Sequence, residues 1–183
     1  MATCDIVTLE EALSYLKCPE DDSAFVQSLI TNVSAQAEKY TGRFFVQRSI
    51  TEHKDADGED ELFLKKYPIV GVPVVTDTSN NSPVTDFLIY KEEGFLYREA
   101  TWDIGRQRWK AEYVSGYAED TASVPSDIKQ AVLEWIASRY NRTDPSVRSE
   151  GIGDLSTSYE SNDQFAMPAT TKAFLDKYKV VEF

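Results

Sequence analysis

The sequence of 183 residues is poor in the side chains that most often perform catalysis or bind metals. It contains one histidine, His53, and two cysteines, Cys4 and Cys18. One histidine cannot build a His-based triad or a zinc site with several histidine ligands. Two cysteines near one end of the chain do not indicate a disulfide framework. We therefore expect no His-based catalytic centre, no metal ion and no cofactor.

The sequence also lacks long hydrophobic runs. No stretch approaches the roughly 18 consecutive apolar residues of a membrane-spanning helix. The first residues, MATCD, lack the basic region and apolar core of a secretory signal. These two absences predict a soluble protein that is made in a reducing cytoplasm and does not contact a membrane.

Basic residues are few as well. The chain has 19 Lys and Arg against 31 Asp and Glu, which gives a formal net charge of -12. Such a charge repels phosphate backbones, so specific binding of nucleic acid is disfavoured. An acidic surface serves solubility, and it could also face passing DNA without holding it.

The apolar content is sufficient for a folded core, and its spacing predicts helices at both ends of the chain. Hydrophobic residues make up 42% of the sequence. Thr8 and Glu11 form a capping-box pattern, which predicts a helix to about Lys17. A second helix is expected over 22–41, ended by Gly42, and a third begins at Pro125. The third has an apolar stripe that should pack on the second helix and that consists of Ile128, Ala131, Val132, Trp135, Ile136 and Tyr140.

Between the second and third helices the pattern changes to the two-residue period of strands. Strands are expected near 45–50, 61–64, 70–75, 87–90 and 108–114, separated by turn signals such as Asp57-Gly58 and Glu93-Gly94. The short spacing favours antiparallel hairpins. We therefore predict an α+β fold with a mainly helical core of three to four helices and an antiparallel β insertion between helices two and three.

The end of the chain is expected to form an extended arm. Residues 141–167 are rich in Ser, Asp, Asn and Gly and are long for a loop within a compact domain. A last short helix should begin near Pro168. The predicted organisation is one domain over 1–148, with its helical core at 1–42 and 119–148 and its β insertion at 43–118, followed by a C-terminal arm over 149–183.

Several segments in a fixed order resemble the head-tail connector proteins of long-tailed bacteriophages, also called adaptor or head completion proteins. They are VTLEEA at 7–12, LK at 16–17, DD at 21–22, YTGR at 40–43, LKKYPI at 64–69, YVSGY at 113–117, VPSDIKQA at 124–131 and SEGIGDLS at 149–156. The similarity covers most of the chain. The β insertion is larger than in the shorter members of that family.

The resemblance implies a structural adaptor with no enzymatic chemistry. Such a protein forms a homo-oligomeric ring of about twelve copies under the portal protein of the virion. The ring extends the DNA channel, which DNA crosses without specific binding, and docks the next connector, a stopper or a tail protein. It would be assembled in the cytoplasm of the host bacterium and reside at the head-tail interface.

Two sets of residues are candidates for contacts with partners. Apolar anchors in the arm are candidates for portal binding, and they are Phe174, Tyr178, Val180, Val181 and Phe183. For Phe174 an equal alternative is that the last helix packs back on the domain. Trp102 lies beside turn-forming residues, where its ring is expected to be partly exposed and to face a tail component or another interface.

Two other functional classes stay open at this point. A monomeric or dimeric acidic protein that mimics DNA or regulates a basic partner would account for the charge of -12. A hydrolase with paired carboxylates would account for the many acidic residues. The resemblance favours the connector over both.

Overall fold

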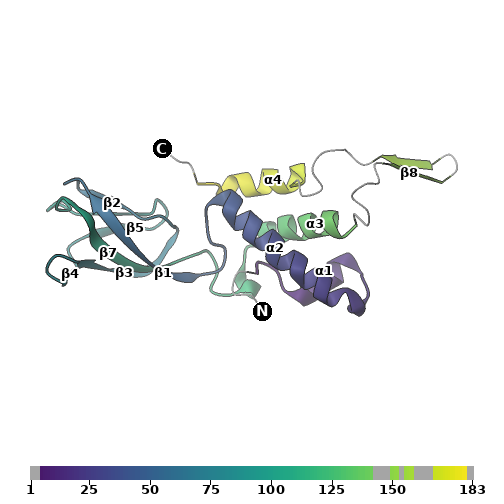
Figure 1. Cartoon of the computed structure of the whole chain (residues 1–183), viewed down its shortest axis with the longest axis horizontal. Coiled ribbons are helices and arrows are strands. Elements are labelled where there is room, and N and C mark those ends of the chain that lie inside the picture. The colour runs from purple at the N-terminus through teal and green to yellow at the C-terminus, as the bar shows by residue number, and fades with distance from the viewer. Residues whose placement is uncertain (1–4, 142–148, 153–154, 159–166, 181–183) are drawn as a thin grey trace. The chain divides into compact units, whose positions relative to one another are not determined.

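The structure is a computed structural model that describes residues 5–141, 149–152, 155–158 and 167–180. It divides into two compact units, one helical and one of β strands. The helical unit comprises residues 1–41 and 125–179, and the β unit comprises residues 42–124 and 180–183. Figure 1 labels their helices and strands and confirms the predicted α+β class.

The helices begin and end close to where the sequence predicts. The helical unit contains α1 (Leu9–Leu16), α2 (Ser23–Thr41), α3 (Ser126–Tyr140) and α4 (Ala169–Leu175), with single 3₁₀ turns at Glu20–Asp22 and Asp176–Tyr178. The capping box of α1 is present, because the Thr8 hydroxyl accepts from the Glu11 amide at 3.2 Å and the Glu11 carboxylate accepts from the Thr8 amide at 2.8 Å. Gly42 follows α2 with a φ of +75°, a conformation that favours glycine.

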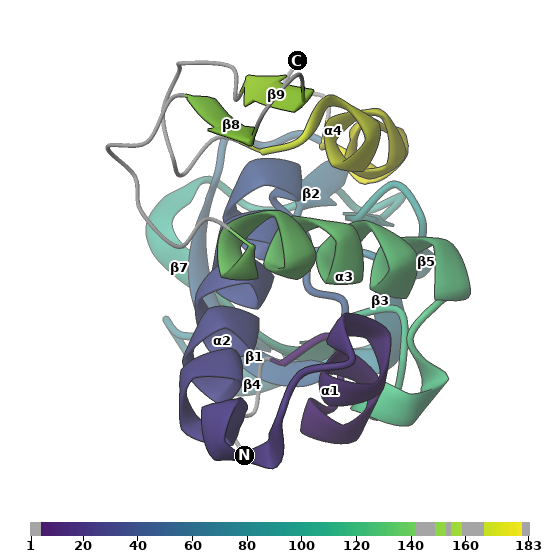
Figure 2. The same cartoon turned by 90° about the vertical axis from the view of Figure 1, so that its right-hand side faces the viewer.

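The apolar stripe of α3 forms the centre of the helical unit. Ile128, Ala131, Val132, Trp135 and Ile136 are buried, and α3 packs against α1, α2 and α4 (Figure 2). The last helix is fastened to this core. Leu175 is fully buried, and the Thr171 hydroxyl donates to the Ala131 carbonyl at 3.1 Å. α4 therefore packs on the helical unit through Leu175 and Thr171, while Phe174 itself stays partly exposed.

The β unit contains two antiparallel sheets. The first has the order β1-β7-β3-β4 and the second the order β2-β6-β5. The strands are β1 (Arg48–Ala56), β2 (Glu61–Phe63), β3 (Ile69–Asp77), β4 (Ser82–Val84), β5 (Leu88–Tyr90), β6 (Phe95–Tyr97) and β7 (Gly105–Ser115). The sequence did not predict β4 or β6. Residues of β4 resemble a turn, because Ser82 and Pro83 follow two asparagines.

The two sheets enclose one core, and Trp102 lies inside it. Trp102 and Trp109 are 0% and 1% exposed, and their rings meet edge to face with centroids 5.1 Å apart. The Trp102 indole nitrogen donates to the carbonyls of Asp60 at 3.1 Å and Leu96 at 3.3 Å. The prediction of a partly exposed Trp102 at an interface is therefore wrong. The turn-like residues beside Trp102 indicate only the local backbone structure, whereas residues of other strands bury its ring.

The segment predicted as a long loop after α3 contains regular structure in its described part. β8 (Ser149–Ile152) and β9 (Leu155–Ser158) pair in an antiparallel fashion. Among the helices of the described ranges, none is long and apolar enough to cross a membrane.

The two faces of the second sheet allow a matched test of the β core. Leu96 on β6 is 0% exposed, whereas Leu88 on β5 is 62% exposed. Leu96→Ala should lower the free energy of unfolding by about 2–5 kcal/mol, because it removes buried methyl groups and leaves a cavity. Leu88→Ala should change it by less than about 1 kcal/mol. Denaturant unfolding followed by tryptophan fluorescence measures both, and equal losses would contradict the assignment of the faces.

Candidate interaction surfaces

Within the described part of the chain, no group of His, Cys, Asp or Glu side chains is placed to hold a metal ion. His53 is exposed on β1, and its register partner on β7 is Lys110. The described side chains instead form exposed surfaces, together with the hydrogen bonds and ion pairs that hold these surfaces in place.

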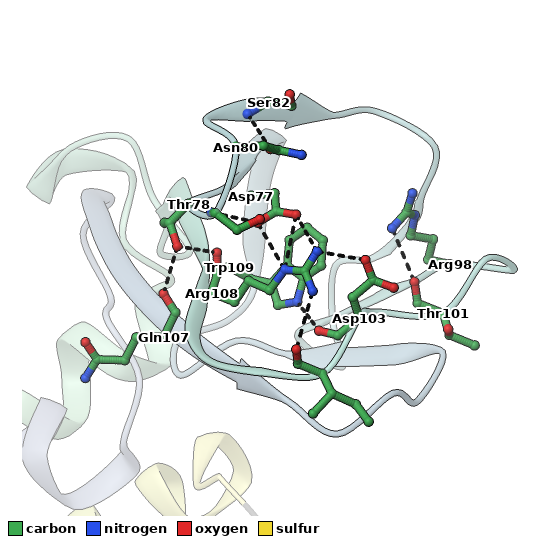
Figure 3. Close-up of polar contacts among 12 residues, drawn as sticks. Asp77, Thr78, Asn80, Ser82, Arg98, Thr101, Asp103, Gln107, Arg108 and Trp109 are labelled. Carbon is green, nitrogen blue, oxygen red and sulfur yellow. Dashed lines mark hydrogen bonds and ion pairs between the residues drawn. The ribbon is translucent and has the colours of Figure 1, made fainter.

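Arg108 holds together three segments of the β unit (Figure 3). From β7, its guanidinium forms a forked pair with Asp77 of β3, with nitrogen-oxygen distances of 2.8 to 3.2 Å. The same side chain pairs with Asp103 at 2.8 Å and lies over the Trp109 ring, 5.3 Å from its centroid. A forked, charge-assisted pair of this kind fixes the orientation of the Arg108 guanidinium as well as its distance from the Asp77 carboxylate.

The Arg108 pair determines the charge of Asp77. The Asp77 carboxyl is mostly buried, which alone would raise its pKa. Hydrogen bonds from Arg108, aided by the amide of Ser79 at 2.9 Å, outweigh burial and hold the pKa of Asp77 well below its usual range. Asp77 is therefore ionised at neutral pH and holds Arg108 in place.

The loop before β7 depends on these contacts. The Trp109 indole nitrogen donates to the Asp103 carbonyl at 3.1 Å, and Arg98 donates to the Thr101 carbonyl at 3.2 Å. Ile104, the residue after Asp103, is 72% exposed. The loop thus presents an apolar side chain to solvent from a firmly held backbone.

A second buried carboxylate, Glu52, is also structural. The Tyr113 hydroxyl donates to it at 3.0 Å and the Lys65 amide at 2.9 Å. Burial, and then the charge of Glu52, raise the pKa of Tyr113 above its ordinary value. The acid lies between a tyrosine and a backbone amide, so this arrangement does not resemble the paired carboxylates of a hydrolase.

The outer faces of the two sheets differ in chemistry. The register places Phe63, Phe95 and Tyr90 side by side across β2, β6 and β5, with Tyr97 and Leu88 in the next row. The centroids of the Phe95 ring and its two neighbours are 5.4 and 4.3 Å apart. We call these five residues the aromatic face. An exposed apolar patch such as the aromatic face is typical of protein contact surfaces. By contrast, the outer face of the first sheet includes an ion pair of Lys110 and Glu112 at 2.9 Å.

The helical unit carries a basic, aromatic surface where α2 ends. The Lys172 and Lys179 ammonium groups lie 5.9 and 5.2 Å from the centroid of the Tyr40 ring, and Lys177 lies 5.1 Å from that of Phe174. The Tyr40 hydroxyl donates to Asp176, which also pairs with Lys172 at 2.8 Å. We call Tyr40, Lys172, Phe174, Lys177 and Lys179 the lysine cluster.

The structure describes three of the predicted portal-binding residues, Phe174 and Tyr178 in the helical unit and Val180 in the β unit. Phe174 and Tyr178 are partly buried, and the Tyr178 hydroxyl donates to the Asp127 carboxylate at 2.8 Å. Val180 is partly buried beside Gly42, where a Cβ added to the glycine would lie 3.1 Å from the valine. Val181 and Phe183 lie outside the described residues.

Sequence reasoning missed both the aromatic face and the lysine cluster. The sequence does contain a signal for the aromatic face, because residues 62–64, 88–90 and 95–97 are continuously apolar or aromatic. Antiparallel strands with one solvated face alternate instead, so unbroken apolar strands indicate two covered faces. The lysine cluster gives no local signal, because Tyr40 is distant in the sequence from the lysines.

The pair of Asp77 and Arg108 predicts an acid-dependent loss of stability. A carboxyl whose pKa is lower in the folded than in the unfolded protein stabilises the fold. Its contribution to the free energy of unfolding is complete above the unfolded pKa of about 3.9 and is lost as the pH falls below that value. Asp77→Asn should therefore cost about 1–3 kcal/mol at neutral pH and should flatten the decline in acid. Thermal unfolding between pH 7 and pH 3 measures this. The matched change Asp103→Asn, at an exposed partner of Arg108, should have little effect, and equal effects would contradict the role of Asp77.

Comparison with known proteins identifies the family. The chain has the fold of neck proteins in solved structures of gene transfer agent (GTA) particles. One structure is titled as the neck of an empty GTA particle computed with C6 symmetry, with a TM-score of 0.66, 16% identity, and coverage of 100% of this chain and 94% of that one. Another is the virion of a native GTA particle, with a TM-score of 0.66, 18% identity, and coverage of 97% and 91%. A third is the neck of a native GTA particle computed with C12 symmetry, with a TM-score of 0.65, 16% identity, and coverage of 100% and 94%.

None of the curated proteins compared with the sequence matches it. The model of one sequence family, described as Head completion protein, matches residues 5–181. The match spans both units and nearly all of the chain. The chain therefore belongs to the head completion protein family and is a structural head-tail connector, not an enzyme.

Proposed function

We propose that this connector forms a ring of about twelve copies in the virion neck, between the portal and the next connector or tail protein. The observation that carries the proposal is the family match over residues 5–181. The whole-chain likeness to neck structures computed with sixfold and twelvefold symmetry supports the ring. An acidic DNA-mimic protein would account for the charge but not for this match.

The ring extends the channel through which DNA leaves the head. The net charge of -12 supports this role, because an acidic wall repels the phosphate backbone and lets DNA slide. A basic wall would instead bind DNA and retard it.

The end of the chain binds the portal. The anchors are Phe174, Tyr178, Val180, Val181 and Phe183. Burial of Leu175 and the hydrogen bond of Thr171 hold α4 on the helical unit, so the residues after it start from a fixed point. Apolar and aromatic side chains of this kind suit a groove on a partner.

Truncation of the last four residues tests this function. Removal of residues 180–183 leaves α4 and the buried Leu175 intact, so the melting temperature should change by no more than a few degrees. Co-sedimentation with the portal should fall at least tenfold, since Val180, Val181 and Phe183 are three of the five anchors. The full-length chain should bind the portal and appear as a ring by electron microscopy.

The control is a full-length chain in which only the exposed Val72 of β3 is changed to Ala. Its portal binding should equal that of the unaltered chain. Undiminished portal binding by the truncated protein would reject the proposed anchors, and failure of the full-length chain to bind the portal would reject the proposed function.

A further inference from the structure

We propose that neighbouring copies in the ring contact one another head to tail, with the start of α2 in one copy docked on the lysine cluster of the next. The inference rests on the proposed ring and names the contact that builds it. The occupant of the lysine cluster is thus a second copy of this chain. All residues of the proposed contact belong to the helical unit.

The lysine cluster is a positive surface on a negative protein. Residues 167–180 contain three lysines and one aspartate, a net charge of +2, whereas the whole chain carries -12. Lys172, Lys177 and Lys179 are exposed. Their ammonium groups lie over the rings of Tyr40 and Phe174, so the surface offers both positive charge and flat apolar area.

The start of α2 has the complementary chemistry. Glu20, Asp21 and Asp22 form the turn that precedes the helix, and the first two are exposed. Phe25 follows within the first turn of α2 and is 52% exposed. Its ring lies beside Tyr140, at a centroid distance of 6.2 Å, and the Tyr140 hydroxyl donates to Asp22. We call Glu20, Asp21, Asp22 and Phe25 the acidic end.

A simpler explanation of these charges is the dipole of α2, which favours acids at its start and bases at its end. That effect is confined to the first and last turns of a helix. It accounts for Asp22 and Lys39, but Lys172, Lys177 and Lys179 belong to α4 and the residues after it. It also does not account for Phe25, whose ring is half exposed beside carboxylates.

The two surfaces lie at opposite ends of one rigid element. α2 has 19 residues and is therefore about 28 Å long. A contact between different ends of identical subunits is heterologous, and such contacts form a ring when the rotation from one copy to the next closes. Copies with a net charge of -12 repel one another overall, so a local attraction between opposite charges would help them to associate.

Charge reversal in the full chain tests the contact without the portal. The first variant, Glu20→Lys with Asp21→Lys, makes the acidic end basic. The second, Lys177→Glu with Lys179→Glu, makes the lysine cluster acidic. Sedimentation velocity over a concentration series at low salt should show association of the unaltered chain that weakens as salt rises. Each variant should associate at least tenfold more weakly than the unaltered chain.

The decisive result is restoration. The chain with all four reversals should associate within about threefold of the unaltered chain, because each pair has merely exchanged signs. A mixture of the two single-end variants should associate likewise. The control, Glu92→Lys with Glu93→Lys, alters exposed acids in the turn between β5 and β6 and replaces two acids with two lysines, as the first variant does. It should therefore leave the salt-dependent association in place.

Three outcomes would overturn the inference. They are an unaltered chain that stays monomeric at low salt, single-end variants that associate normally, and four reversals that fail to restore association. If the lysine variant associates normally but loses the portal, the lysine cluster belongs to the portal contact instead. Portal binding by the unaltered chain would then still support the proposed function, so the two failures are distinguishable.

Discussion

The docking of α4 on α3 is the contact on which the surface chemistry of the helical unit depends. Leu175 is fully buried, and Thr171 uses its hydroxyl to bind a backbone carbonyl inside the core. These two contacts bring the lysines near the end of the chain to Tyr40 at the end of α2. Without them, the three lysines would lie on a separate segment and would not be held beside Tyr40.

In the β unit, too, internal contacts hold the surface segments in place. Its sheets close over Trp102 and Trp109, and Arg108 fastens the adjacent loop to β3 through Asp77 and Asp103. The core is thus complete without Phe63, Tyr90 and the rest of the aromatic face, which stay at the surface. A structural protein needs few reactive groups, because rigid units that present contact surfaces are enough for assembly.

The helices could be predicted from the sequence because their signals are local. The capping box of Thr8 and Glu11 and the stripe that includes Trp135 are each contained within a few turns of chain. Trp102 was misjudged because its neighbours in sequence resemble a turn, whereas its burial depends on Leu96 and Trp109 in other strands. Sequence alone could not reveal the lysine cluster either, since a long-range contact of α4 creates it.

The family assignment and the structure describe one protein whose role is to join other proteins. The resemblance of its sequence motifs, the match to the head completion family over residues 5–181 and the fold shared with neck proteins agree. The proposed ring, portal contact and head-to-tail subunit contact would give the lysine cluster and the acidic end a role in assembly.

Electron microscopy of particles assembled without this protein tests the central claim most directly. The account predicts heads that have packaged DNA but carry no tails, with tails accumulating separately. Normal numbers of tailed, DNA-filled particles in the absence of the protein would contradict the claim that it completes the head and connects it to the tail.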